Sequence, residues 1–105
     1  MIGFSSNVLE FTDGLSLESF VDNRIVYDAT LRNLELIGEA ATHVPANIRG
    51  KYAAIPWRMI VATRNQLIHA YLGIDNDTLW SIIQDDVPEL LPLLRELLDN
   101  ESQRN

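Results

Sequence analysis

Residues 22–44 read DNRIVYDATLRNLELIGEAATHV, and this stretch decides the fold class. Its apolar residues recur at mostly three- and four-residue spacing, the pattern of a helix with one buried face. The predicted buried face consists of Ile25, Ala29, Leu34, Ile37, Ala41 and Val44. Asp28 and Arg32 lie one helical turn apart and are expected to pair on the solvent side. Pro45 forces its predecessor out of helical geometry, so one long helix is predicted from about Asp22 to Val44.

The segments before this helix also carry helical signals. Residues 1–12 predict a short first helix that ends at Asp13-Gly14, where glycine can adopt the left-handed conformation of a helix end. Ser16 is expected to cap a second short helix, with Phe20 and Val21 facing the core.

The second half of the chain predicts two further helices. Residues 45–55 form a connector with room for one helical turn. Pro56 then opens a helix that runs to about Tyr71, because the first position of a helix needs no N–H. Residues 75–77 supply a cap for the last helix, which is predicted over about 78–99. Pro88 lies inside that helix, so we expect a kink or a restart near it.

Together these segments predict an all-α fold, a single up-and-down bundle of four to five helices that forms one domain over residues 1–105. Trp57 and Trp80 are expected to anchor its core, and the tail 101–105 to fray. The sequence contains no known metal-binding motif, and we expect neither a metal nor another cofactor.

The composition is that of a globular domain. The chain has 105 residues, of which 47% are apolar and 22% charged, enough for one modest core. It has no cysteine, which excludes disulfides, thiolate metal sites and a cysteine nucleophile. Short apolar runs and the lack of a basic-then-apolar leader favour a cytoplasmic location. The net charge of −7 should repel nucleic acid, so any RNA chemistry has to occur at a local basic spot.

Arg64 breaks the pattern of its own helix. On a wheel that advances about 100° per residue, six large apolar or aromatic side chains of this helix fall within roughly 60° of Arg64, whereas Met59 falls on the far side. They are Trp57, Ile60, Val61, Leu67, Ile68 and Tyr71. An unpaired guanidinium is very costly in a dry core. Three explanations stay open: an ion pair with Glu35 or, preferably, Glu39; a cleft that holds an anionic ligand; or a groove shared with a second subunit.

His69 follows Arg64 in the same helix and lies one turn after Asn65. Histidine can transfer protons near neutral pH, and arginine can hold a phosphate and stabilise charge as it develops. This pair suits metal-independent RNA cleavage, in which a 2′-hydroxyl loses its proton and a phosphorane forms. Arg64 and His69 lie about 140° apart on the wheel, which favours a composite site at a homodimer interface.

The segment RNQLIHAY (residues 64–71) resembles the Arg, four residues, His, any residue, Tyr motif of HEPN-domain toxins. Five further segments resemble the HepT-like group of HEPN/MNT toxin–antitoxin pairs in the same order, so the resemblance covers about residues 15–99. These segments read LSLESF, RNLELIGEAA, IPWRMI, HAYLGID and LWSIIQDDVPEL.

The resemblance implies a homodimeric, metal-independent endoribonuclease with Arg64 and His69 as the catalytic pair and Asn65 in support. It also implies a minimal nucleotidyltransferase (MNT) as antitoxin, which silences the toxin by transferring AMP from ATP to Tyr71. The net acidity and small size of the chain leave an alternative open. In that alternative, a non-catalytic HEPN dimer binds a nucleotide or a nucleotidyltransferase partner.

Overall fold

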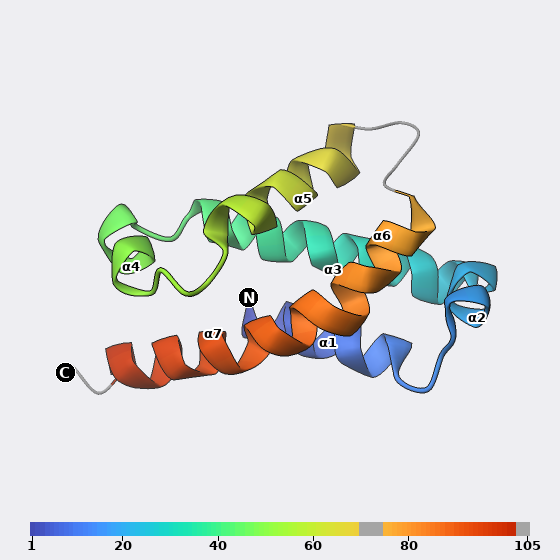
Figure 1. Cartoon of the computed structure of the whole chain (residues 1–105), viewed down its shortest axis with the longest axis horizontal. Coiled ribbons are helices and arrows are strands. Elements are labelled where there is room, and N and C mark those ends of the chain that lie inside the picture. Colours follow the sequence, from blue (N-terminus) through green and yellow to red (C-terminus); the bar gives the residue numbers. More distant parts are fainter. Residues whose placement is uncertain (70–74, 103–105) are drawn as a thin grey trace.

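The computed structural model describes residues 1–69 and 75–102, except for the side chain of His69. Every regular element in this part of the chain is helical, which confirms the all-α prediction (Figure 1). The elements are α1 (Ile2–Thr12), α2 (Leu17–Asp22), α3 (Arg24–Thr42), α4 (Ala46–Lys51), α5 (Trp57–His69), α6 (Asn76–Ser81), the π-helical η1 (Ile82–Asp86) and α7 (Val87–Ser102).

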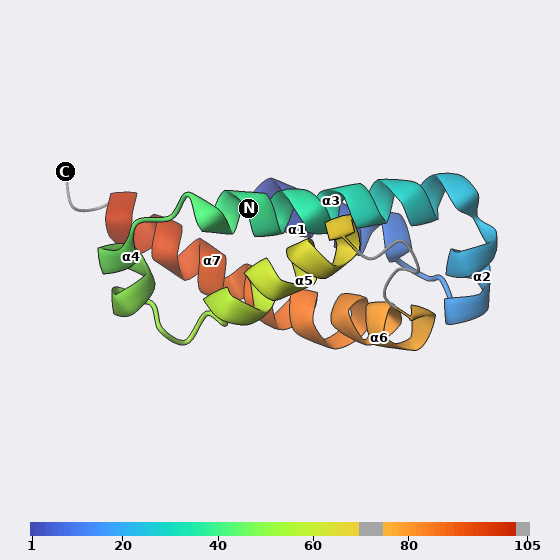
Figure 2. The same ribbon diagram turned by 90° about the horizontal axis from the view of Figure 1, so that it is seen from above.

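Four long segments build the bundle: α1, α3, α5 and the continuous rod of α6, η1 and α7 (Figures 1 and 2). Successive long segments run in opposite directions, as the up-and-down prediction requires. Helices α2 and α4 are only six residues each and turn the chain at the two ends of α3. Helix α3 lies in the middle and packs against both α1 and α5.

Helix α3 confirms the long predicted helix, but it begins two residues later than predicted, at Arg24. Asn23 caps it, and its side-chain oxygen accepts a hydrogen bond from the Val26 N–H at 3.1 Å. On the predicted face, Leu34, Ile37 and Ala41 are buried, but Ile25 is 82% exposed. That part of the prediction was wrong, because nine residues separate Ile25 from Leu34 and nine steps of about 100° place them on opposite sides of a helix.

The predicted ion pair on α3 also differs in its partners. Asp28 pairs with Arg24 at 3.4 Å instead of with Arg32, and Arg32 pairs with Glu35 at 3.4 Å. Both arginines are largely exposed, so the choice of partner has little effect on stability.

Helix α2 begins as predicted at Ser16. The Ser19 N–H donates to the Ser16 hydroxyl at 3.1 Å, and the Ser16 N–H donates to the Ser19 hydroxyl at 2.8 Å. This reciprocal cap satisfies two N–H groups that a helix start leaves free. Phe20, the buried residue of α2, packs its ring against Tyr27 of α3 and Trp80 of α6, with both centroid distances 5.2 Å. One side chain thus fixes α2 to two other helices.

The restart predicted near Val87 is the π-helical segment η1. Pro88 has no N–H, and its ring would collide with the carbonyl of Gln84 in a regular α-helix. The chain widens instead, and the Val87 N–H donates to the Ile82 carbonyl five residues back. The cap at 75–77 is also present, since the Asp75 carboxylate accepts from the N–H and the hydroxyl of Thr78.

The last helix extends further than predicted. Helix α7 continues to Ser102, so the expected fraying was wrong for residues 101 and 102. The Glu101 carboxylate accepts a hydrogen bond from the Tyr52 hydroxyl at 2.6 Å and lies 2.9 Å from the Lys51 ammonium. These contacts join the end of α7 to the end of α4.

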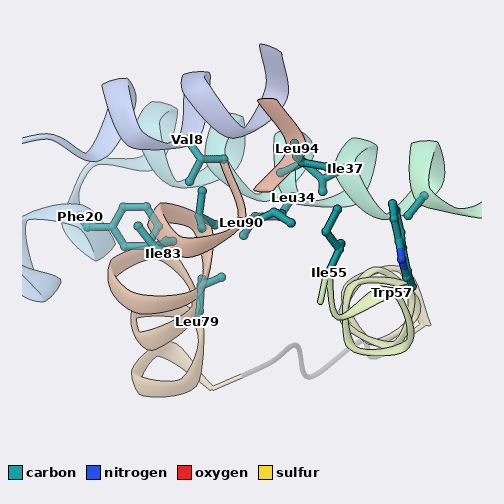
Figure 3. Packing of buried hydrophobic residues seen from close by; sticks show 12 residues of the cluster. Val8, Phe20, Leu34, Ile37, Ile55, Trp57, Leu79, Ile83, Leu90 and Leu94 are labelled. Atoms are coloured by element: carbon teal, nitrogen blue, oxygen red, sulfur yellow. The ribbon is translucent and has the colours of Figure 1, made fainter. Parts of the chain in front are cut away.

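The core draws on every long segment (Figure 3). Its most buried side chains include Val8, Phe20, Ile37, Leu79, Ile83 and Leu94. Trp57 is 7% exposed and donates from its indole nitrogen to the Tyr52 carbonyl, which confirms its role as a core anchor. Trp80 is half-buried against Phe20.

Candidate active site

Helix α5 carries the predicted catalytic residues and packs mainly on α3 (Figures 1 and 2). The two helices approach each other closely at Gly38 of α3, which faces the base of the Arg64 side chain and the backbone of Ile60. The stem of Arg64 therefore lies on the surface of α3 at its only interior glycine, which agrees with the position of Arg64 on the apolar stripe.

The guanidinium of Arg64 is half-buried and turns toward its neighbour in sequence. Its Nη1 donates a hydrogen bond to Oδ1 of Asn65 at 2.9 Å. Its Nε is buried and has no hydrogen-bond partner among the residues the structure describes. A buried donor without an acceptor is uncommon in folded proteins and calls for an explanation.

The ion pair with Glu35 or Glu39, one of the three explanations left open for Arg64, is absent from the described part of the chain. Glu35 pairs with Arg32, and Glu39 is an exposed residue of α3. Two of the three explanations for Arg64 therefore remain: a cleft for an anion, or a groove shared with a second subunit.

His69 is the last residue of α5, about 7.5 Å along the helix axis from Arg64 and one turn beyond Asn65. The side chain of His69 and the whole of Tyr71 lie outside the described residues. The placement of these two predicted site residues relative to Arg64 is therefore a sequence-based expectation.

A groove that sequence reasoning missed runs along the other side of α5. Met59 and Thr63 of α5 line one wall, and Ile82 and Asp86 of η1 line the other. The groove is mostly apolar, and Met59 is 48% exposed in it. Met59 and Thr63 lie on the opposite side of the α5 wheel from Asn65, so this groove is separate from the Arg64 guanidinium.

Asp86 is an acidic residue of that groove whose carboxyl is partly buried. Burial raises the pKa of its carboxyl above the ordinary value, and the negative charges of Asp85 and Glu89 raise it further. A pKa that is higher in the folded than in the unfolded protein means that ionisation of the group opposes folding. The cost is absent below the unfolded-state pKa and is fully present above the folded-state pKa.

Replacing Asp86 by asparagine is therefore expected to stabilise the protein near pH 7, by less than about 1 kcal/mol because solvent screens a half-buried group. The gain should be much smaller at about pH 3.5, just below the ordinary aspartate pKa of about 3.9. Thermal unfolding at the two pH values measures both effects. Asp99→Asn, which removes an exposed carboxylate, is the control. A gain that is equal at both pH values would contradict the burial argument.

A family comparison identifies the type of protein to which this site belongs. The family model described as "Ribonuclease HepT-like" matches residues 1–97. The chain belongs to the HepT-like ribonuclease family. The resemblance found in the sequence is thereby confirmed, and the all-α bundle agrees with it.

Several relatives of this HepT-like chain carry ribonuclease names. "Putative RNase MJ1380" of Methanocaldococcus jannaschii is 40% identical over 82% of the chain and 79% of its own length. "Putative RNase TTE0752" of Caldanaerobacter subterraneus subsp. tengcongensis is 36% identical over 90% and 84%. "Probable ribonuclease HepT" of Thermococcus cleftensis is 38% identical over 77% and 74%. No solved structure gives a significant match.

Over residues 1–69 and 75–102, no group of three or more histidines, aspartates or glutamates is arranged to hold a metal ion. Over the same ranges, no helix has the length and apolar character needed to cross a membrane.

Proposed function

We propose that this HepT-like chain is a metal-independent endoribonuclease whose catalytic pair is Arg64 and His69. The observation that carries the proposal is the burial and hydrogen bonding of Arg64, in a chain that belongs to a family of ribonucleases. Its guanidinium is half-buried, has no carboxylate partner in the described part of the chain, and keeps one buried donor without an acceptor. A phosphate oxygen can supply the missing acceptor and the missing negative charge.

The chemistry divides between the two side chains. His69 takes the proton from the ribose 2′-hydroxyl, whose oxygen attacks the adjacent phosphorus. Arg64 stabilises the charge that builds up on the phosphorane. The bond from phosphorus to the 5′-oxygen then breaks, and the protonated imidazole returns a proton to that leaving oxygen. The products are a 2′,3′-cyclic phosphate and a free 5′-hydroxyl. Asn65 supports the reaction by holding Nη1 of Arg64.

The active form in this proposal is a homodimer with a composite site. Arg64 and His69 point about 140° apart on one helix, so two copies of α5 are needed to bring an arginine and a histidine to the same phosphate. Ile68 lies between their directions on the wheel and is 45% exposed, which supports a second subunit covering this side of α5.

Regulation in this proposal takes place at Tyr71. We propose that a minimal nucleotidyltransferase antitoxin, in the same cytoplasmic compartment, transfers AMP from ATP to the Tyr71 hydroxyl. The added phosphate would occupy the anion site at Arg64 and exclude RNA by charge and by volume.

The test is RNA cleavage by the purified protein in the presence of a chelator. His69→Ala and Arg64→Ala are each expected to reduce the rate by about 100-fold or more, the usual contribution of a proton-transfer or charge-stabilising group. His43→Ala and Arg95→Ala are matched controls, because His43 is the other histidine and both residues are exposed at other places in the bundle. Equal cleavage by all five proteins would refute the proposal.

A second candidate function rests on the net charge of −7, which opposes RNA binding. In it, the same dimer is a non-catalytic module that binds a nucleotide or its nucleotidyltransferase partner. Tight binding to the nucleotidyltransferase without any cleavage of RNA by the free protein would favour this candidate.

A further inference from the structure

We propose that Gly38 is a positioning residue for Arg64: its missing side chain lets α5 approach α3 closely enough to set the path of the Arg64 stem. The inference rests on the proposed function for its catalytic consequence. The geometric part stands on the contact between the two helices.

The contact leaves no room for a side chain at position 38. A Cβ on residue 38 would overlap Cβ of Arg64, and would lie 2.7 Å from its Cγ and 3.1 Å from the Ile60 carbonyl oxygen. Carbon atoms in contact prefer separations of about 3.5–4.0 Å. The obstructing atoms are the base of a side chain and a backbone group, so the end of a flexible chain cannot simply swing away. Either α5 must move or the Arg64 stem must take another path.

Other glycines in helices of the described residues do not share this constraint. At Gly3 in α1 and Gly50 in α4, an added Cβ would meet nothing within 4 Å. Glycine is less favourable than alanine inside a helix. Its presence in the middle of the nineteen-residue α3 therefore has a reason in packing, and the packing partner is Arg64.

A displacement at the stem reaches the guanidinium. The hydrogen bond from Nη1 to Asn65 and the burial of Nε both depend on where Cβ and Cγ of Arg64 lie. A misplacement of about 1 Å in a reacting group can reduce a rate by about 100-fold. Gly38 itself touches neither RNA nor the reacting atoms in this scheme, so its effect should appear in turnover more than in RNA affinity.

The experiment compares Gly38→Ala with Gly50→Ala in the full chain. Gly38→Ala is expected to lower kcat for RNA cleavage by about 100-fold with little change in KM, and Gly50→Ala to match the wild type. Ile83→Val and Ile83→Ala, in the core near Phe20 of α2 (Figure 3), supply folded proteins of reduced stability. Below their melting temperatures they should keep wild-type kcat, which separates positioning from stability. A kcat loss in the Ile83 variants equal to that of Gly38→Ala would overturn the proposal.

A second measurement does not depend on catalysis. The Nε–Hε NMR signal of Arg64, assigned by its absence in Arg64→Met, should shift in Gly38→Ala and stay in place in Gly50→Ala. If the wild type cleaves no RNA, the proposed function fails, but this shift still tests the positioning of Arg64. An unchanged signal in Gly38→Ala would overturn the proposal even if the protein is an active ribonuclease.

A double variant covers the case in which Gly38→Ala does not fold. Arg64→Gly removes both of the closest obstructing atoms, so Gly38→Ala should be far less destabilising in that background than in the wild type. The four proteins to compare are the wild type, Gly38→Ala, Arg64→Gly and the double variant. Their melting temperatures give the coupling, as does recovery of folding in the double variant. No coupling would show that the obstruction is not Arg64, and the proposal would fall.

Discussion

Replacing Arg64 by methionine is expected to reduce the rate of RNA cleavage by about 100-fold or more and to leave the protein at least as stable as the wild type. The substitution removes a buried Nε that has no acceptor in the described part of the chain, and such a group costs about 1–3 kcal/mol. Methionine keeps an unbranched stem that can cover the surface at Gly38. Cleavage needs the positive charge, so activity and stability should change in opposite directions.

Urea denaturation and the chelator-resistant cleavage assay measure the two effects of Arg64→Met. Arg95→Met, at an exposed position of α7, controls for the loss of one positive charge. Arg64→Ala is expected to lose stability, because it removes the stem as well as the charge. A clear loss of stability in Arg64→Met would mean that the guanidinium has a structural partner, and the case for an anion site would be lost with it.

Phe20→Ala has the largest expected effect on folding. Phe20 is fully buried, and removal of a phenyl ring from a core typically costs about 3–5 kcal/mol. Its tilted contacts with Tyr27 and Trp80 each add about 0.5–1.5 kcal/mol beyond burial. Domains of this kind have a total stability of about 5–15 kcal/mol, so much of the protein should be unfolded or close to it.

The free energy of unfolding from urea titration tests the Phe20 prediction. Phe11→Ala is the matched control, because the same ring is removed from a position that is 37% exposed. It should cost clearly less than Phe20→Ala, about 1–2 kcal/mol, because part of its ring is already in contact with water. If the two variants lost the same stability, the role of Phe20 as the link between α2, α3 and α6 would be contradicted.

Local signals in the sequence predicted most of the fold. Ser16 and Asp75 cap helices through their own side chains, and Pro88 disturbs a helix through its own missing N–H. Ile25 was misplaced because the predicted face included a five-residue step from Ala29 to Leu34, which turns a helix by about 140°. Residues 101 and 102 were misjudged because Glu101 bonds to Tyr52, a residue far away in sequence.

Part of the candidate site was also predictable from local signals, and the rest depends on contacts between helices. Arg64 on the apolar stripe and its neighbour Asn65 follow from helical geometry within one segment. The missing carboxylate partner, the role of Gly38 and the groove beside Met59 depend on how far apart two helices lie. Periodicity within one helix contains no information about that distance. The roles of His69 and Tyr71 are those that the family resemblance implies, and they stay predictions.

The π-helical segment η1 also sets the register of everything after it. Its wide turn accommodates one residue more than an α-helical turn would, and α7 emerges with Leu90 and Leu94 directed into the core. Deleting a single residue from 82–86 would rotate the rest of the chain by about 100° and turn that apolar stripe outward. The number of residues in this short stretch is therefore constrained more tightly than their identities, and insertions or deletions should be tolerated there least of all.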